Sequence, residues 1–242
     1  MKMIRMTNVC KGGGFLKAVI VMGILGLTAC SSEPASLQQG PDAEMTKEGL
    51  VRVDHSKLDL SYARPDVNWA NYTKLYFEPV KVTNDHPADY QPPKIDKRAD
   101  GLNATYELPQ EALAKMSEQF SLTVKEVFNS EQPFELVAQP GPNTLVIEAA
   151  VTDIRLSAPL ESSRRSFSSM GRTYTENSGS MMLLAVIKDG ETGEVLAKAA
   201  DRGQGFNQWS QNTQVFNWGD VKTVYRSWVN DFKNALMNAG AE

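Results

Sequence analysis

The first thirty residues determine how much of this chain is available to fold. An apolar run from Ala18 to Leu27 follows four basic residues, which are Lys2, Arg5, Lys11 and Lys17. No acidic residue occurs before Cys30, and a basic segment followed by a short apolar run is typical of a secretory signal peptide. The run is well short of the roughly 20 apolar residues of a membrane-spanning helix, which disfavours a transmembrane anchor. We therefore expect residues 1–29 to be removed on export.

The signal ends in Leu27-Thr28-Ala29-Cys30, which resembles the lipobox of bacterial lipoproteins. In that family the chain is cut before the cysteine, whose thiol receives a diacylglycerol and whose new amine receives a fatty acid such as palmitate. The resemblance implies that Cys30 is lipidated, and several acyl chains together anchor a protein stably. Ser31, not aspartate, follows Cys30, which by resemblance to Gram-negative lipoproteins implies an outer-membrane anchor and a periplasm-facing body. A plain secreted protein is the alternative.

Charge and cysteine content exclude several classes of function. The signal carries four of the 25 basic residues and none of the 29 acidic ones, so the mature chain has 21 basic residues and a formal charge of −8. Such a surface is poorly suited to nucleic acid. Cys10 leaves with the signal and Cys30 carries lipid, so the body has no thiol for a disulfide, a nucleophile or a metal site.

The mature chain is predicted to consist of a tether and one domain. Residues 31–49 are rich in serine, glutamate, proline, glutamine and glycine and have little apolar content. With the lipidated cysteine, residues 30–49 are therefore expected to form a flexible tether. Residues 50–242 contain the periodic apolar patterns and are expected to form a single domain without internal repeats.

Alternation of apolar and polar residues predicts the strands of this domain. The four main strands are residues 74–82, 144–156, 179–188 and 194–202. Pro79 interrupts the first of them and favours a place near an edge of the sheet. The second is the clearest, with Leu145, Ile147 and Val151 on one face. The sequence at 189–193 is typical of a turn and predicts a hairpin between the last two strands.

Two amphipathic helices are predicted from apolar residues that recur every three or four positions. The first begins near Pro109 and ends near Asn129, and its stripe is Leu113, Met116, Phe120, Val124 and Val127. The second begins at the N-cap Asp220 and ends at Gly240. Strands outnumber helices and follow one another as neighbours. This order favours an α+β fold, a mostly antiparallel β-sheet packed against two amphipathic helices on one face.

Three segments of the domain, taken in order, resemble a known family. They are Arg64-Pro65-Asp66 followed by residues 72–80, then 141–145 leading into 151–154, then 189–201. Behind a lipobox, these segments are similar to the proteobacterial lipoprotein family known as the domain of unknown function 3313 family. The similarity extends from Val51 to Met237. The family brings no catalytic residue and no cofactor to carry over, and it implies one periplasmic domain on a lipid anchor.

Histidines are few, and they are the first place to look for metal binding or acid–base chemistry. His55 and His86 both lie in lead-in or loop segments beside aspartates. A metal site could use them together with Asp54, Asp85 and Asp89. No fixed spacing such as HExxH supports such a site, and solvated polar loops are the default interpretation. We therefore expect no metal and no cofactor.

Other catalytic arrangements have no better support. Serines are frequent in residues 162–169, but no GxSxG motif surrounds any of them. The carboxylates of Glu148, Asp153 and Glu161 could form a glycosidase pair, although nothing in their spacing requires it. Positions on an exposed strand face are the alternative for these residues.

The long polar connection 157–178 is the first candidate binding segment. Its arginines and aromatic residues are Arg164, Arg165, Phe167, Arg172 and Tyr174. Such a set could bind a carboxylate, a phosphate or a protein partner. A disordered loop or an extended hairpin is the alternative.

The second candidate is an aromatic segment beyond the predicted hairpin. Its aromatic residues are Phe206, Trp209, Phe216 and Trp218. Aromatic rings beside amide side chains suit a sugar, but they equally suit a plug over the open end of a sheet, which we favour.

Together these observations favour a lipid-anchored envelope protein that is a non-enzymatic binding or scaffolding module. The membrane is its partner through Cys30, and an envelope protein or peptidoglycan is a further candidate partner. One alternative is a hydrolase of peptidoglycan or another glycan, which needs converging carboxylates near Trp209 and Trp218, one of them with a raised pKa. The other is an accessory subunit of an envelope assembly, marked by an exposed apolar patch or strand edge.

Overall fold

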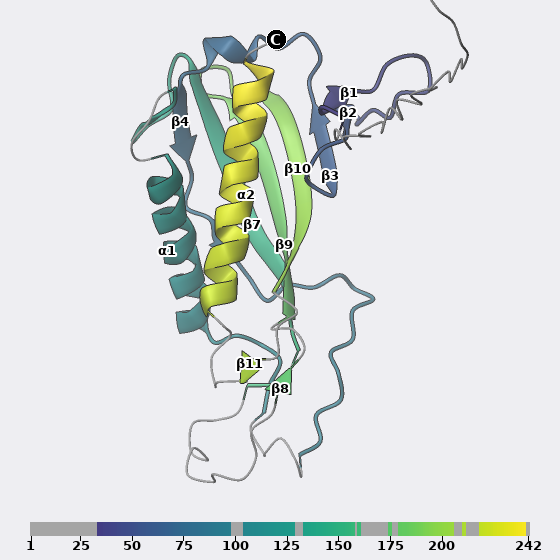
Figure 1. Cartoon of the computed structure of the whole chain (residues 1–242), viewed down its shortest axis with the longest axis vertical. Helices are drawn as coiled ribbons and strands as arrows, with labels where there is room; N and C mark the ends of the chain where they lie inside the picture. Colours follow the sequence, from purple (N-terminus) through teal and green to yellow (C-terminus); the bar gives the residue numbers. More distant parts are fainter. Residues whose placement is uncertain are drawn as a thin grey trace, which may run out of the picture. The chain divides into compact units, whose positions relative to one another are not determined.

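The computed structural model describes residues 33–97, 104–128, 133–157, 159–160, 174–175, 179–205, 210–211 and 218–240, all within the compact unit Glu33–Glu242. Within these residues, nine strands form one mixed sheet, and two α-helices cover one of its faces (Figure 1). The predicted α+β fold is therefore confirmed. The expected signal peptide and Cys30 lie outside the described residues.

The sheet has an antiparallel part and a parallel part. Its strand order is β1-β2-β3-β10-β9-β7-β4-β6, and β5 also pairs with β7. Neighbouring strands from β1 to β7 are antiparallel, whereas β4, β5 and β6 run parallel to their partners. The bounds are β1 Ser36–Leu37, β2 Val51–Asp54, β3 Leu60–Ala63, β4 Lys74–Phe77, β5 Lys81–Val82, β6 Glu135–Leu136, β7 Thr144–Leu156, β9 Gly179–Asp189 and β10 Val195–Gln204. A separate small sheet pairs β8 (Tyr174–Thr175) with β11 (Ser210–Gln211).

The single strand predicted over residues 74–82 is in fact two strands. Proline has no N–H to donate to a neighbouring strand, and the pairing stops on both sides of Pro79. The backbone N–H of Glu78 still donates to the carbonyl of Ile147 at 3.0 Å, so β4 and β5 stay aligned on β7. Both strands are parallel to β7, because the long connection through the first helix can return the chain in the same direction.

The two helices bury the predicted apolar stripes against the sheet. α1 (Gln110–Val127) begins directly after Pro109, which serves as its N-cap. α2 (Trp218–Ala239) begins two residues before the predicted N-cap Asp220 and ends as predicted at Gly240, whose N–H donates to the carbonyl of Leu236 at 3.0 Å. A short 3-10 helix, η1, spans Trp69–Asn71. The helix-facing side of β7 is buried as predicted, at Leu145, Ile147 and Val151.

The two helices also pack on one another at the centre of the core. The rings of Phe120 from α1 and Tyr225 from α2 lie edge to face, with their centroids 5.1 Å apart. Tyr225 is fully buried, and burial raises the pKa of its hydroxyl well above the usual range. Trp228 from α2 donates its Nε1–H to Oδ2 of Asp201 in β10 at 2.6 Å, which joins the helix to the sheet by a charge-assisted hydrogen bond.

The predicted flexible tether over residues 30–49 is corrected by the structure in its described part, which begins at Glu33. Ser36–Leu37 forms β1 and pairs with β2, and Gln38 donates from Nε2 to Oδ1 of Asp54 at 2.8 Å. Low apolar content predicts a tether, but backbone pairing and amide hydrogen bonds hold this polar segment on the sheet. The connection between Cys30 and the first strand is therefore residues 31–35.

The close approach of β10 to α2 depends on a residue without a side chain. A Cβ built at Gly203 would lie 2.2 Å from Cγ1 of Val224 and 2.7 Å from Cζ2 of Trp228. We predict that Gly203→Ala lowers the free energy of unfolding by about 1–3 kcal/mol, because the helix must shift to relieve the overlap. Chemical denaturation followed by circular dichroism measures this.

Gly141→Ala is the matched control, because a Cβ at Gly141 meets no atom within 4 Å. Its free energy of unfolding should change by less than about 0.5 kcal/mol. Equal effects at the two positions would contradict the close-approach argument.

Candidate functional site

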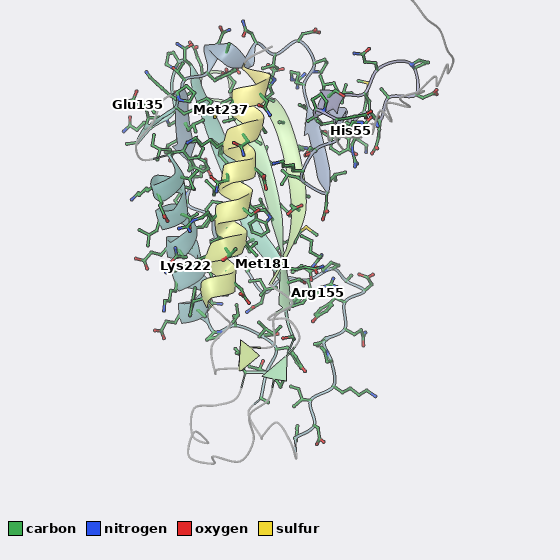
Figure 2. All side chains as sticks on the ribbon, in the orientation of Figure 1. His55, Glu135, Arg155, Met181, Lys222 and Met237 are labelled. Carbon is green, nitrogen blue, oxygen red and sulfur yellow. The ribbon has the colours of Figure 1, made fainter. Side chains whose placement is uncertain are left out.

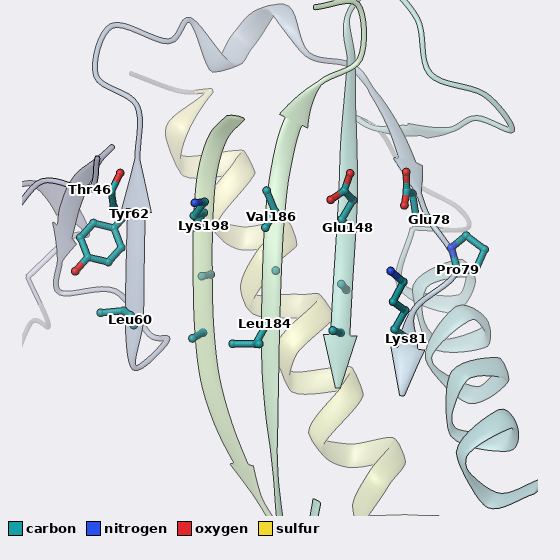
Figure 3. Close-up of a pocket in the computed structure, with 15 residues that line it drawn as sticks. Thr46, Leu60, Tyr62, Glu78, Pro79, Lys81, Glu148, Leu184, Val186 and Lys198 are labelled. Atoms are coloured by element: carbon teal, nitrogen blue, oxygen red, sulfur yellow. The ribbon is translucent and has the colours of Figure 1, made fainter. Parts of the chain in front are cut away.

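The sheet face opposite α1 and α2 is open, and it holds a shallow depression of about 500 Å³. Figure 3 shows this helix-free face, with the strands in front and the helices behind them. Its floor is apolar and its rim is polar or charged. The floor side chains are Leu60, Ala150, Leu184, Val186 and Ala200, and the rim side chains include Thr46, Tyr62, Glu78, Pro79, Lys81, Glu148 and Lys198.

The apolar floor follows from the sequence of β9. Its residues 181–187 are all apolar, so the strand presents apolar side chains to both faces of the sheet. Leu183 points into the core and is buried, whereas the next residue, Leu184, leaves 45% of its surface exposed on the helix-free face. An antiparallel sheet covered on one side normally places polar residues on the other side. This face therefore differs from an ordinary solvated sheet surface.

The charges around the depression are of both signs and are partly paired. Lys198 donates to Oε1 of Glu48 at 2.7 Å, and this hydrogen bond is the main reason that the pKa of Glu48 falls to about 2. Lys188 pairs with Glu148 on β7. The side chains of Glu78 and Lys81 make no ion pair with another residue in the described part of the chain. The rim thus has charges of both signs around an apolar centre.

A second polar site lies at the far end of β7, around the buried carboxylate of Asp153, and we refer to it as the Asp153 cluster. Asp153 is 2% exposed and sits at an irregularity of the β7–β9 pairing with a positive φ of 46°. Its Oδ1 accepts from Nε of Arg155 at 2.9 Å and lies 2.8 Å from Nδ1 of His86. Its Oδ2 lies 2.8 Å from Nη2 of Arg155 and pairs with Arg202. The ring of Tyr90 stacks on His86 with centroids 4.3 Å apart.

The electrostatics of the Asp153 cluster favour a structural role. Burial raises the pKa of Asp153, but hydrogen bonds from Arg155, His86 and Arg202 outweigh burial and hold the pKa well below its usual range. A general acid needs the opposite, a raised pKa. The backbone N–H of Asp153 also donates to the carbonyl of Asp85 at 2.8 Å. The cluster therefore ties the segment around Asp85 and His86 to the end of the sheet.

Parts of the three segments that carry the family resemblance, residues 72–74, 141–144 and 189–190, meet at the other end of β7. Tyr72 donates its hydroxyl proton to Oδ2 of Asp189 at 2.7 Å. The carbonyl of Asn143 accepts from the N–H groups of Thr73 and Lys74, both at 3.1 Å. Gly190 donates to the carbonyl of Thr144 at 2.8 Å, and a Cβ at Gly190 would lie 2.8 Å from that oxygen. These hydrogen bonds join the start of β4, the turn before β7 and the turn between β9 and β10.

The histidines considered for a metal site do not come together. His55 lies beside the β1–β2 hairpin with its Nε2 2.9 Å from Oε2 of Glu33, while His86 belongs to the Asp153 cluster. Figure 2 shows His55 well apart from Arg155, the neighbour of Asp153. The carboxylate of Asp54 accepts a hydrogen bond from the side-chain amide of Gln38. The described residues contain no group of three or more histidine, cysteine, aspartate or glutamate side chains that could hold a metal ion.

Most of the two candidate binding segments falls outside the described residues. The undescribed positions are Arg164, Arg165, Phe167, Arg172, Phe206, Trp209 and Phe216, together with the carboxylate candidate Glu161. The backbone of Tyr174 pairs with Gln211 in the small sheet. Trp218 begins α2 and packs against the hydrophobic core, and Nζ of Lys115 lies 4.5 Å from its ring centre.

Sequence reasoning missed the helix-free face and the Asp153 cluster, although both left signals. The unbroken apolar run 181–187 is typical of a strand covered on both faces, whereas the alternation of residues in this strand predicts only its inner face. The sequence pattern places Asp153 and His86 in two different hypothetical sites. Only the fold reveals that they are neighbours, because 67 positions separate them.

Comparisons with known proteins identify the family. Residues 46–232 match the family described as "Protein of unknown function (DUF3313)", so the chain belongs to this family. No curated protein matches the sequence. Neither helix in the described part of the chain is long and apolar enough to cross a membrane.

The similar solved structures are distant. A PelC dodecamer from Paraburkholderia phytofirmans is 10% identical, over 71% of this chain and 92% of that one, with a TM-score of 0.33. A DUF4136 family protein from Bacteroides thetaiotaomicron is 11% identical, over 72% and 93%, with a TM-score of 0.31. Lipoprotein GNA1162 from Neisseria meningitidis is 13% identical, over 67% and 99%, with a TM-score of 0.23. Such distant similarity carries no argument about function.

Charge removal at Asp153 should destabilise the fold. Asparagine tolerates a positive φ, so Asp153→Asn keeps the backbone, removes the charge that compensates Arg155 and Arg202, and replaces one acceptor oxygen by an N–H donor. We expect a loss of about 2–4 kcal/mol in the free energy of unfolding at pH 7. The control is Glu148→Gln on the same strand, whose partly exposed pair with Lys188 should contribute less than about 1 kcal/mol. Urea unfolding of both variants distinguishes the two cases.

Acid should weaken the junction at Asp189. Hydrogen bonds from the N–H of Thr192 and from Tyr72 lower the pKa of Asp189 from 3.8 to about 2, against the effect of burial. A lowered pKa in the folded state gives stability that is present above pH 4 and is lost as the pH falls from about 4 to about 2. We predict that Asp189→Asn removes on the order of 1–2 kcal/mol of this acid dependence. Denaturant midpoints measured from pH 2 to pH 6 test this, and parallel pH profiles for both proteins would contradict it.

Proposed function

We propose that this member of the family is a lipid-anchored protein of the Gram-negative cell envelope that acts as a non-enzymatic binding or scaffolding module. Cys30 carries the lipid in the outer membrane, and the α+β domain faces the periplasm. The basic segment, the short apolar run and Leu27-Thr28-Ala29-Cys30 support the anchor, because together they form a lipoprotein signal. Ser31 supports the outer membrane as the destination.

The observation that carries the binding role is the helix-free face of the sheet. Exposed apolar patches with polar rims typically mark interaction sites on soluble domains. Here Leu184 and Val186 lie at the centre of the face, and charged side chains surround them (Figure 3). This is the kind of surface expected of a protein that binds other proteins within an envelope assembly.

The state of Asp153 supports a binding role over hydrolysis. Of the three carboxylates considered for a glycosidase pair, Asp153 is held ionised by cations and Glu148 pairs with Lys188 on the sheet face. A glycosidase requires one carboxylic acid that stays protonated near neutral pH.

The anchor is tested by metabolic labelling with a clickable palmitate analogue followed by density-gradient separation of the two membranes. We expect wild-type protein to be labelled and to sediment with the outer membrane, because Cys30 accepts the acyl chains. Cys30→Ala should lose all label. The variant should then either leave the membrane fraction or keep its uncleaved signal peptide. Cys10→Ala is the matched control and should keep both the label and the membrane.

The destination has its own variant. Ser31→Asp should keep the label but move the protein to the inner-membrane fraction. Label on Cys30→Ala would contradict the lipid site, and an unchanged gradient for Ser31→Asp would contradict the assignment of the outer membrane.

A further inference from the structure

We propose that the helix-free face binds a second copy of this chain about a two-fold axis that runs along β9. This inference rests on the proposed function, in which the face is a protein-binding surface, and it names the occupant. The residues that carry it belong to two rows across the sheet. The rows are Leu60, Ala200, Leu184, Ala150 and Lys81, and Tyr62, Lys198, Val186 and Glu148.

The first row provides a self-complementary apolar centre. Leu184 stands on the middle strand, directly between Ala200 on β10 and Ala150 on β7 in the pairing register. A large exposed side chain between two alanines forms a ridge with a shallow hollow on each side. The Leu184 side chain leans from β9 toward β10 (Figure 3), so an axis along β9 brings the two leucines side by side, each over the Ala150 side of the other copy. This arrangement would bury Leu184, which is 45% exposed in the single chain.

The second row provides the charge complementarity. Val186 lies between Lys198 on one side and Glu148 on the other, so opposite charges flank the middle strand symmetrically. A two-fold axis along β9 places β10 of one copy over β7 of the other copy, and the reverse. It therefore places Lys198 of one copy opposite Glu148 of the other, twice in the same interface. Packed sheets lie about 10 Å apart, a gap that a lysine and a glutamate can bridge together.

The ion pairs that Lys198 and Glu148 make within one chain do not prevent them from pairing with the other copy. Lys198 pairs with Glu48 and Glu148 pairs with Lys188, and all four side chains are between 29% and 48% exposed. Ion pairs at such exposed positions contribute little and reform readily with new partners.

The direction of the axis also suits two anchors in one membrane. A two-fold rotation about an axis along β9 keeps equivalent residues at the same level along the strands. Glu33, only three residues after Cys30, then lies at the same level in both copies. Five strands at about 4.8 Å spacing and about 20 Å length give roughly 500 Å² per copy, the size of a reversible interface. Anchoring of both copies in one membrane raises their effective concentration and favours the pair.

The direct test is thiol crosslinking of the full-length lipidated protein in intact envelopes. The mature chain has no thiol besides Cys30, so Leu184→Cys introduces a single reactive group. A short bismaleimide should join two copies of Leu184→Cys into a species of twice the mass. Leu122→Cys on α1 is the matched control, since Leu122 is 50% exposed away from the helix-free face, and it should stay single.

Charge exchange tests the axis itself. In detergent solution, Lys198→Glu and Glu148→Lys should each weaken dimerisation at least tenfold, measured by mass photometry over a concentration series. The double variant should restore dimerisation, because it reverses both sides of each cross-copy pair. Weakening in the single variants without restoration in the double variant would overturn the axis along β9.

The crosslinking outcomes separate this inference from the proposed function. A Leu184→Cys product that contains two copies of this chain supports the inference. A benzophenone maleimide on Leu184→Cys captures partners that lack a thiol, and a photoproduct that contains one copy and a different envelope protein overturns the inference and leaves the binding role intact. No product at Leu184 with either partner, in a variant whose denaturation midpoint matches wild type, overturns both.

Discussion

The structure depends on one imbalance: the middle strand β9 is apolar on both faces of the sheet, but the two described α-helices cover only one of them. Adjacent residues of β9 show the two sides of this imbalance, since Leu183 is buried under the helices and Leu184 is half exposed on the other side. The inner face is filled by α1 and α2, whose rings of Phe120 and Tyr225 meet at the centre. Exposed apolar area is the main driving force for association of folded proteins. The second face is therefore the part of the domain with most to gain from a partner.

Two carboxylates of this fold, at opposite ends of β7, hold the ends of strands and the connecting segments together. At one end of β7, Asp153 collects His86, Arg155 and Arg202 and so fixes the segment that follows β5. At the other end, Asp189 accepts the hydroxyl of Tyr72 and the N–H groups of its own turn. In both places the hydrogen-bonding capacity of a carboxylate is occupied by partners within the chain. Within the described part of the chain, this leaves the helix-free face, where charges are partly exposed, as a surface available for recognition.

Sequence periodicity predicted the elements whose local pattern agrees with their tertiary environment. The strand over residues 144–156 and both helical stripes belong to this group, because their apolar residues face the core. The pairing of Ser36–Leu37 with β2 depends on backbone hydrogen bonds and leaves no trace in composition. The early start of α2 at Trp218 follows from packing of its ring on the core, which no capping rule contains. The residues of the Asp153 cluster meet only through folding, so their proximity could not be read from spacing.

Under the proposed lipidation of Cys30, the connection between lipid and fold is short, and this gives the helix-free face its context. Residues 31–35 span at most about 20 Å, so an anchor at Cys30 would keep the domain near the membrane and restrict its orientations. A long tether would let the face meet partners from any direction, and the entropy lost on binding would be correspondingly larger. With five residues, much of that entropy is already lost before a partner arrives. A modest interface of alternating leucine, alanine and paired charges can then be occupied in the envelope even where it is weak in solution.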